Sequence, residues 1–337
     1  MKAFEIRKSF GLDSLTLVER PDPIPGPGDV LVRVRAASLN FRDLLTVQGL
    51  YNPKQTLPLI PLSDGVGEVV QVGDGVTRVT VGERVAGSFF QEWLSGPSNK
   101  TKLLSALGGP LDGMLTDHIA LSEEGVVSVP GHLSDEEAAT LPCAAVTAWN
   151  ALVEQGQMKA GETLLVLGTG GVSLFALQFG RILGARVIVT SSSDQKLERA
   201  RAMGAALTIN YTAIPDWEKK VRELTGGLGA DHVLEVGGGE TFPRSVKATR
   251  IGGHISLIGG LTGLTADVNL ASILMQNIRV QGLIVGSRET FEAMNRAIGL
   301  HQLRPVVDRI FPFAESRAAF EHLAGQGHFG KIVIRMD

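Results

Sequence analysis

Cysteine is almost absent from this chain of 337 residues, which has one, Cys143. A single cysteine excludes an internal disulfide framework and suits a reducing compartment. Concentrated positive charge is missing too: Lys and Arg are scattered and the net charge is −3. We therefore expect neither nucleic acid nor an anionic membrane surface as a partner.

Long apolar runs are also missing. No uninterrupted run reaches the about 18 residues that a membrane helix needs, and the opening MKAFEIRKSF lacks the apolar core of a secretion signal. With 44% hydrophobic and 20% charged residues, the composition is typical of a soluble globular protein. We expect a cytoplasmic chain of two domains, because the length exceeds that of one ordinary core.

Glycine, in contrast, is abundant at 41 residues, and it divides the first ~120 residues into short segments. The segment 30–39, VLVRVRAASL, alternates apolar and polar residues as a half-buried strand does. The segment 65–87 adds strands joined by Gly and Asp-Gly turns. Several short strands at this spacing predict a barrel or a sandwich.

From Thr163 onward, apolar strand-like segments alternate with helical ones. Strands at this spacing, separated by helices, predict βαβ units and a doubly wound parallel sheet. The predicted strands are 163–167, 186–191, 231–236 and 254–259, and the predicted helices include 172–184 and 194–204.

A glycine-rich turn joins the first of these strands to its helix, in the sequence TLLVLGTGGVSLFALQFG. Glycines here allow a tight turn and let the backbone approach a pyrophosphate, while the helix N-terminus offers free N–H groups to the anion. Ser173 replaces the third glycine of the usual pattern. The expected cofactor contacts in and around this turn are Gly168, Gly170, Gly171 and Val172, with Gly237 and Gly259 after later strands.

The next strand ends in Ser191, Ser192 and Ser193, where an NAD site usually has an acidic residue for the ribose 2′-hydroxyl. Nothing here would repel a 2′-phosphate, and Lys196 in the following turn could reach one. We therefore expect NADP(H) to be preferred, with NAD(H) possible. The alternatives are that Ser193 only caps the helix, that Lys196 is solvated, and that Asp194 binds the ribose.

The order of these parts resembles the medium-chain dehydrogenase/reductase superfamily over the whole chain. The motifs that carry the resemblance are GDVLVRVRAASLNFRDLLTVQGLY, LPLIPLSDGVGEVVQVGDGV, TLPCAAVTAWNAL, LGTGGVS and HFGKIVI. It implies an α/β fold in which a GroES-like β-barrel catalytic domain (residues 1–143 and 297–337) is combined with a doubly wound Rossmann cofactor domain (residues 144–296).

The same resemblance implies that the catalytic zinc of related alcohol dehydrogenases is missing. Their Cys, His-Glu and second Cys or Asp correspond to Asn40, Ser63 followed by Asp64, and Cys143. Asn and Ser are poor zinc ligands, so we expect no metal. Cys143 is then a small apolar side chain of the site, because no histidine motif near it supplies the base that a nucleophile needs.

SLNFRD with a downstream GLY resembles the quinone-reductase branch, where the matching Asn, Asp and Tyr line the substrate pocket. This implies Asn40, Asp43 and Tyr51 as catalytic residues, with the Asn40 amide and the Tyr51 hydroxyl as hydrogen-bond donors. Their structural alternatives are a strand-end turn, a helix cap and a barrel side chain. Leu45 stands where many quinone reductases have another tyrosine.

Three further assignments follow from the resemblance alone. Thr147 matches a residue that packs on the nicotinamide, Tyr211 a tyrosine near the 2′-phosphate, and Lys331 a basic residue that meets the pyrophosphate. Their alternatives are a core threonine, an edge-strand tyrosine and a surface lysine.

The leading interpretation is a zinc-independent, NADPH-preferring oxidoreductase that moves hydride between the nicotinamide and a small carbonyl, enone or quinone substrate. The segment 277–286 reads as an apolar edge strand that needs a partner, so we expect a homodimer. Two alternatives remain: an alcohol dehydrogenase with weak metal binding through Cys143 and Asp64, and a non-catalytic nucleotide-binding redox sensor. The segment Phe89–Met114 is either a lid or a packed loop.

Overall fold

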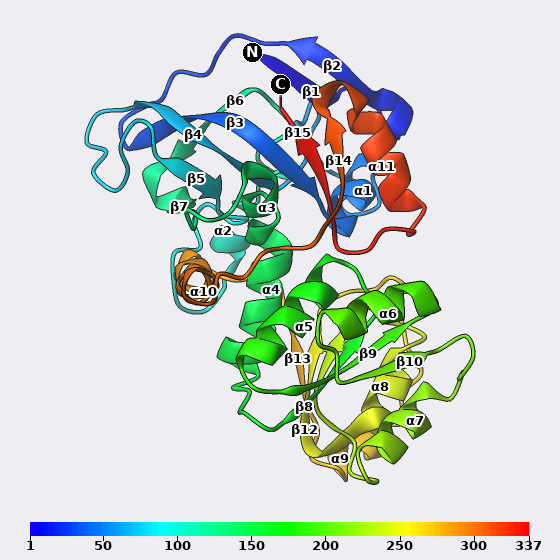
Figure 1. The fold of residues 1–337 in the computed structure, drawn as a ribbon. Helices are drawn as coiled ribbons and strands as arrows, with labels where there is room; N and C mark the ends of the chain where they lie inside the picture. Colours follow the sequence, from blue (N-terminus) through cyan, green and yellow to red (C-terminus); the bar gives the residue numbers. More distant parts are fainter. Residues whose placement is uncertain (337) are drawn as a thin grey trace. The chain divides into compact units, whose positions relative to one another are not determined.

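The computed structural model describes residues 1–336, whose contacts divide into two compact units (Figure 1). The first unit contains residues 1–146 and resumes at Gly286, and the second contains Thr147–Val285. Within the described part of the chain, every helix is too short or too polar to cross a membrane.

The first unit is built on a seven-stranded sheet, mostly antiparallel, with the order β14-β15-β3-β4-β5-β7 and with β6 also paired to β3. A separate antiparallel pair, β1 (Lys2–Ile6) and β2 (Leu15–Glu19), completes its strands. The strands of the large sheet are β3 (Asp29–Leu39), β4 (Asp64–Val72), β5 (Arg84–Gly87), β6 (His118–Ser122), β7 (Val126–Ser128), β14 (Val307–Pro312) and β15 (Lys331–Arg335).

The end of the chain returns to the first unit, as the tail motif indicates. In Figure 1, β15 at the red end of the sequence lies beside the blue β3. The two strands are antiparallel, with Ile332 opposite Leu39 and Ile334 opposite Ala37. These apolar side chains are buried in one core, and their burial excludes a slip of register by one residue. The pairing therefore fixes Lys331 beside the residue that follows β3, Asn40.

The first unit also contains helices. They are α1 (Phe41–Val47), α2 (Lys100–Leu103), α3 (Asp135–Ala138), α10 (Arg288–His301) and α11 (Ser316–Ala324), with single turns η1 (Leu12–Ser14), η2 (Glu123–Gly125) and η5 (Phe313–Glu315). Cys143 lies on a π-helical stretch, η3 (Leu141–Ala145), which continues into α4 (Val146–Trp149) and a second π-helical stretch, η4 (Asn150–Gln155).

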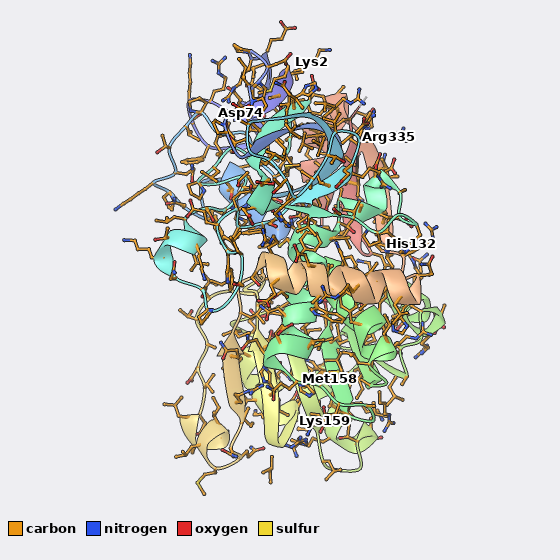
Figure 2. All side chains as sticks on the ribbon, turned by 90° about the vertical axis from the view of Figure 1, so that its left-hand side faces the viewer. Lys2, Asp74, His132, Met158, Lys159 and Arg335 are labelled. Carbon is orange, nitrogen blue, oxygen red and sulfur yellow. The ribbon has the colours of Figure 1, made fainter. Side chains whose placement is uncertain are left out.

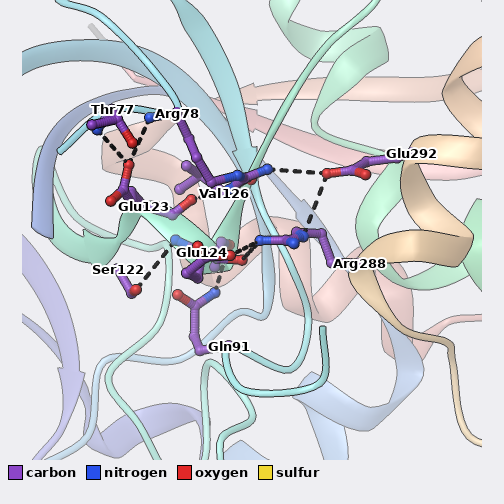
Figure 3. A network of polar contacts seen from close by, with 10 residues as sticks. Thr77, Arg78, Gln91, Ser122, Glu123, Glu124, Val126, Arg288 and Glu292 are labelled. Atoms are coloured by element: carbon purple, nitrogen blue, oxygen red, sulfur yellow. Dashed lines mark hydrogen bonds and ion pairs between the residues drawn. The ribbon is translucent and has the colours of Figure 1, made fainter. Parts of the chain in front are cut away.

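Helix α10 belongs to the first unit, whereas the boundary expected from the sequence, between residues 296 and 297, falls inside it. Its N-terminal turn is tied to the first unit by ion pairs of Arg288 with Glu124 and of Glu292 with Arg78, the latter at 3.0 Å (Figure 3). At its other end His132, labelled in Figure 2, has Nε2 3.0 Å from the carbonyl oxygen of Leu303. These polar contacts join α10 to the first unit, so the boundary between the units lies between Val285 and Gly286.

The second unit has a six-stranded parallel sheet in the order β10-β9-β8-β11-β12-β13, which confirms the doubly wound Rossmann fold. The order reverses between β8 and β11, the place where such folds bind their ligands. The strands are β8 (Thr163–Leu167), β9 (Arg186–Ser191), β10 (Leu207–Asn210), β11 (Ala230–Glu235), β12 (Thr249–Leu257) and β13 (Arg279–Gly282). The helices are α5 (Gly171–Ile182), α6 (Asp194–Ala202), α7 (Trp217–Leu224), α8 (Phe242–Ala248) and α9 (Leu270–Leu274).

Candidate active site

Asn40 lies at the junction where β3 ends and α1 begins. Its backbone is extended, and its N–H donates to Oδ2 of Asp43 at 2.8 Å, which caps the helix. Asp43 is fully buried, and burial raises the pKa of its carboxyl to about 6, partly offset by the Arg42 guanidinium. Asp43 therefore caps the helix, which was the structural alternative to a catalytic role. Asn40, in contrast, is only partly buried.

Lys331 contributes a buried ammonium group to the same place. Its side chain is 4% exposed, and its Nζ donates to the Leu39 carbonyl oxygen and to Oδ1 of Asn40, both at 2.6 Å. The Nζ also lies 3.8 Å from Oδ2 of Asp64. The resemblance implies a pyrophosphate contact for Lys331, but here the ammonium group is engaged by the first unit's own residues.

Asp64 and Ser63 enter the site from the start of β4, because Asp64 is opposite Ser38 in the β3–β4 pairing. Ser63 Oγ donates to Oδ1 of Asp64 at 2.8 Å and is itself 3.4 Å from Nδ2 of Asn40. The N–H of Cys143 reaches Oδ2 of Asp64 at 3.2 Å. Burial raises the pKa of Asp64, while Lys331 and the hydrogen bonds from Asn40 and Ser63 act against that rise.

The backbone N–H of Cys143 thus donates to the Asp64 carboxylate, and the thiol of Cys143 stays protonated. Burial, with Asp64 as the next cause, raises the pKa of this thiol. A nucleophilic cysteine needs the opposite shift. The raised pKa and the backbone contact to Asp64 fit a structural role for this partly exposed residue.

The residues at the three ligand positions do not fit a catalytic zinc. Two of them, Asn40 and Ser63, offer an amide and a hydroxyl, whereas zinc sites use thiolate, imidazole and carboxylate. An ammonium group already lies against Asn40 and close to Asp64. Over residues 1–336, no three His, Cys, Asp or Glu side chains gather as a metal site requires.

Tyr51 follows α1 and is 53% exposed. The guanidinium carbon of Arg42 lies 5.2 Å from the centre of its ring and 4.8 Å from that of Phe89. Arg42 also donates to the carbonyl oxygen of Leu107 at 2.7 Å. Arg42, the residue before Asp43, thus contacts both Tyr51 and the segment Phe89–Met114.

That segment is mostly packed. Its two ends bury Phe89, Phe90, Leu107 and Met114, and its backbone bonds to neighbouring strands and turns. The longest exposed run is its middle, residues 95–101, and Glu92, Leu104, Pro110 and Leu111 are exposed individually. The packed-loop interpretation fits the two ends.

In the second unit, the glycine turn has the geometry that a pyrophosphate site requires. Gly168 has φ +73°, which favours glycine, and a Cβ added at Gly168 or Gly170 would meet no atom within 4 Å. This open space lies at the N-terminus of the 12-residue helix α5, so its free N–H groups can face an anion. Gly171 and Val172 form the first turn of α5 and are partly exposed. The turn fits a nicotinamide dinucleotide.

Ser173, which replaces the third glycine, is accommodated by a hydrogen bond. Its buried Oγ donates to the carbonyl oxygen of Leu167 at 2.7 Å. The close helix–strand contact is thus kept with a side chain in place of a hydrogen atom.

At the end of β9 the structure shows the helix cap that was the alternative for Ser193. Ser193 caps α6 by accepting from the Lys196 N–H at 3.3 Å, and Ser192 is exposed while Ser191 is buried. Asp194 accepts from Nδ2 of Asn210 at 2.8 Å. Tyr211, just after β10, is 41% exposed. Lys196 is in the first turn of α6, where the 2′-phosphate interpretation requires it.

Packing explains three other expected cofactor residues. A Cβ on Gly237 would lie 2.3 Å from Thr241 Oγ1, and one on Gly259 would lie 2.5 Å from the Val236 carbonyl oxygen. These glycines are required by neighbouring atoms of the second unit itself. Thr147, at the start of that unit, is 3% exposed. This burial fits a core threonine, which was the alternative to a contact with the nicotinamide.

Sequence reasoning missed Glu235, the fully buried last residue of β11. Its Oε1 accepts from the N–H groups of Gly237 and Gly238 and from Thr241 Oγ1, and Ser245 Oγ donates to Oε2. The carboxylate thereby fixes the loop at the carboxyl end of the sheet. The available signal was an acidic residue that ends an apolar strand directly before glycines.

The sheet order, the glycine turn and the polar site of the first unit define a nicotinamide-dependent oxidoreductase. The family described as alcohol dehydrogenase GroES-like domain matches residues 26–131, and the one described as zinc-binding dehydrogenase matches residues 171–299. The chain belongs to the medium-chain dehydrogenase/reductase superfamily, among its alcohol dehydrogenase-like and quinone oxidoreductase-like members.

Three known proteins illustrate this membership. A zinc-type alcohol dehydrogenase-like protein of Schizosaccharomyces pombe is 45% identical, over 92% of each chain. The crystal structure of an NAD-dependent alcohol dehydrogenase has 33% identity and a TM-score of 0.91, over the full length of both chains. A mycobacterial protein solved with NADPH has 26% identity and a TM-score of 0.83, over 99% of each chain.

Proposed function

We propose that this protein is a zinc-independent oxidoreductase that prefers NADPH and reduces a small carbonyl compound, enone or quinone. The observation that carries the proposal is the pair Asn40 and Lys331, an amide and an ammonium group, among the residues that match a zinc site. Asn40 is partly exposed and Lys331 is buried. A ligand can therefore reach the amide while the charge behind it stays shielded from water.

When bound, the nicotinamide supplies the hydride. As hydride adds to the substrate, its carbonyl oxygen gains negative charge, and the Asn40 amide donates a hydrogen bond to that oxygen. A donor of this kind contributes about 3–4 kcal/mol to the transition state in well-studied enzymes. Tyr51, held by Arg42 and half exposed, is the candidate that supplies the proton.

A panel of substrates tests this function. Protein treated with a chelator is assayed for NADPH oxidation with an aldehyde, an enone and a quinone, and for NADP⁺ reduction with an alcohol. We expect turnover without added metal and a fall of about 10²–10³ in kcat for Asn40→Ala. Asn99→Ala, at the exposed cap of α2, is the control and keeps full activity. Activity that the chelator abolishes and zinc restores would refute the proposal.

The NADPH preference is supported by the serines at the end of β9 and by Lys196 in the first turn of α6. The related structures include both an NAD-dependent enzyme and an NADPH complex, so the test is made on this chain. Lys196→Ala should weaken NADPH binding about tenfold and leave NADH binding unchanged, because one charge pair with the 2′-phosphate is lost. Equal effects on both cofactors would refute the assignment.

We also propose a homodimer formed by the edge strand β13. This strand ends the sheet, so one row of its backbone groups is unpaired, and a second copy of the chain can continue the sheet there. Large apolar side chains are exposed in β12 and between residues 261 and 284: Ile251, Leu261, Leu264, Leu270, Leu274, Met275 and Ile284. Exposed apolar side chains that gather on one face are typical of an interface.

A further inference from the structure

Lys331 presents a problem that the proposed function leaves open. A buried ammonium group is costly unless it is paired and hydrogen-bonded, and Lys331 is 3% exposed. It lies in the first unit's core, at the start of β15, whereas a contact to a cofactor phosphate requires an accessible side chain. Its partners indicate what it does there.

The contacts of Lys331 fix the orientation of the Asn40 amide. An ammonium group can only donate hydrogen bonds, and its Nζ is 2.6 Å from the side-chain oxygen of Asn40. The oxygen of the amide must therefore face Lys331, and its NH2 group must point away. The two ends of an Asn amide are otherwise hard to tell apart, so the lysine decides which end is presented to a ligand.

The contacts of Asn40 with Ser63 and of Ser63 with Asp64 support the same orientation of the amide. Nδ2 of Asn40 is 3.4 Å from Ser63 Oγ, and Ser63 uses its own hydrogen on Oδ1 of Asp64 at 2.8 Å. Ser63 therefore accepts one hydrogen from the Asn40 amide. Asp64 returns to Lys331 at 3.8 Å and closes the ring. The Asn40 NH2 group therefore faces Ser63 and Asp64, and of these four residues only Asn40 is partly exposed.

We propose that Lys331 is a positioning residue, which turns and polarises the Asn40 amide so that its NH2 group, rather than its oxygen, is presented to the substrate and donates to the reacting oxygen. The positive charge of Lys331 thus supports the developing negative charge beside the residues that match the zinc ligands of relatives. The inference rests on the proposed role of Asn40 as the donor. Lys331 itself does not touch the substrate.

The test compares Lys331→Met, which removes the charge and keeps the length, with Lys331→Arg, which keeps the charge. We expect Lys331→Met to lower kcat about 100-fold, to change KM less than about threefold, and to leave the NADPH dissociation constant within about twofold. Lys331→Arg should recover about tenfold of the lost kcat. Lys219→Met, which removes an exposed lysine of α7, is the matched control and keeps full activity.

A loss confined to NADPH affinity would overturn the inference and return Lys331 to the pyrophosphate. A kcat that stays unchanged in Lys331→Met, or that falls equally in Lys331→Arg, would also overturn it. If Lys331→Met does not fold, as judged by circular dichroism, Lys331→Gln replaces it, because its amide still donates one hydrogen bond without charge. The expected result is then the same fall in kcat with NADPH binding retained.

The Asn40→Ala background separates the two proposals. There, Lys331→Met should change kcat by less than about threefold, because the group that it positions is gone. If Asn40→Ala keeps its activity, the proposed function fails. If Asn40→Ala loses its activity but Lys331→Met keeps its own, only the inference about Lys331 fails. Additive losses in the double variant would show that the lysine acts elsewhere.

Discussion

Burial of Asp43 predicts a pH dependence of stability that one substitution can isolate. The carboxyl is fully buried, its Oδ1 lacks a hydrogen-bond partner, and its pKa rises from 3.8 to about 6. Because the folded state then holds the proton more tightly than the unfolded chain, stability is lost as pH rises between these two values. The shift of about two units corresponds to about 3 kcal/mol in the ionised plateau.

Asp43→Asn removes this ionisation and keeps an oxygen to accept from the Asn40 N–H. The variant should match the wild type in free energy of unfolding near pH 4 and exceed it by up to about 3 kcal/mol above pH 6. Urea unfolding of both proteins between pH 4 and 7.5 measures the difference at each pH. Asp216→Asn, an exposed carboxylate at the start of α7, is the control and should show no such rise with pH. A difference that is constant with pH, or that falls as pH rises, would refute the reasoning.

Three further predictions concern the second unit. Ser173→Ala leaves the buried Leu167 carbonyl without its side-chain donor and should lower stability by about 1–3 kcal/mol, measured by thermal unfolding; an unchanged midpoint would contradict this. For His254, burial and the neighbouring Arg279 lower the pKa to about 4, so stability should fall as pH drops from 6.5 toward 4, and His254→Gln should reduce this dependence. Leu274→Glu places a charge in the exposed apolar region beside β13 and should shift the protein from dimer to monomer in light scattering; an unchanged mass would exclude this face as the interface.

The cofactor turn could be predicted from the sequence because its signal is local. A buried strand, a glycine with positive φ and a helix start follow each other within ten residues, and each demands a particular residue type. The family resemblance supplied the first unit's barrel, including the return of the tail. The second unit therefore followed from a local pattern, whereas the return of the tail to the first unit followed from the resemblance.

The arrangement in the first unit could not be predicted in the same way. Whether Lys331 reaches a phosphate, the surface or Asn40 depends on the β15–β3 register, which joins residues about 290 positions apart. The burial of Asp43 also could not be inferred from the sequence, and this burial decides whether the residue is a helix cap or a reactive acid. Glu235 was overlooked because its four donors come from the loop after β11 and from the start of α8, whose positions only the fold defines.

The metal content of the purified protein tests the central claim most directly. Elemental analysis is made on protein without a histidine tag, prepared without chelator and compared with its buffer. The amide and hydroxyl at two of the three ligand positions, with the Lys331 ammonium group against Asn40, predict less than about a tenth of an equivalent of zinc. Close to one equivalent, lost in Cys143→Ala, would contradict the account and make Cys143 a metal ligand.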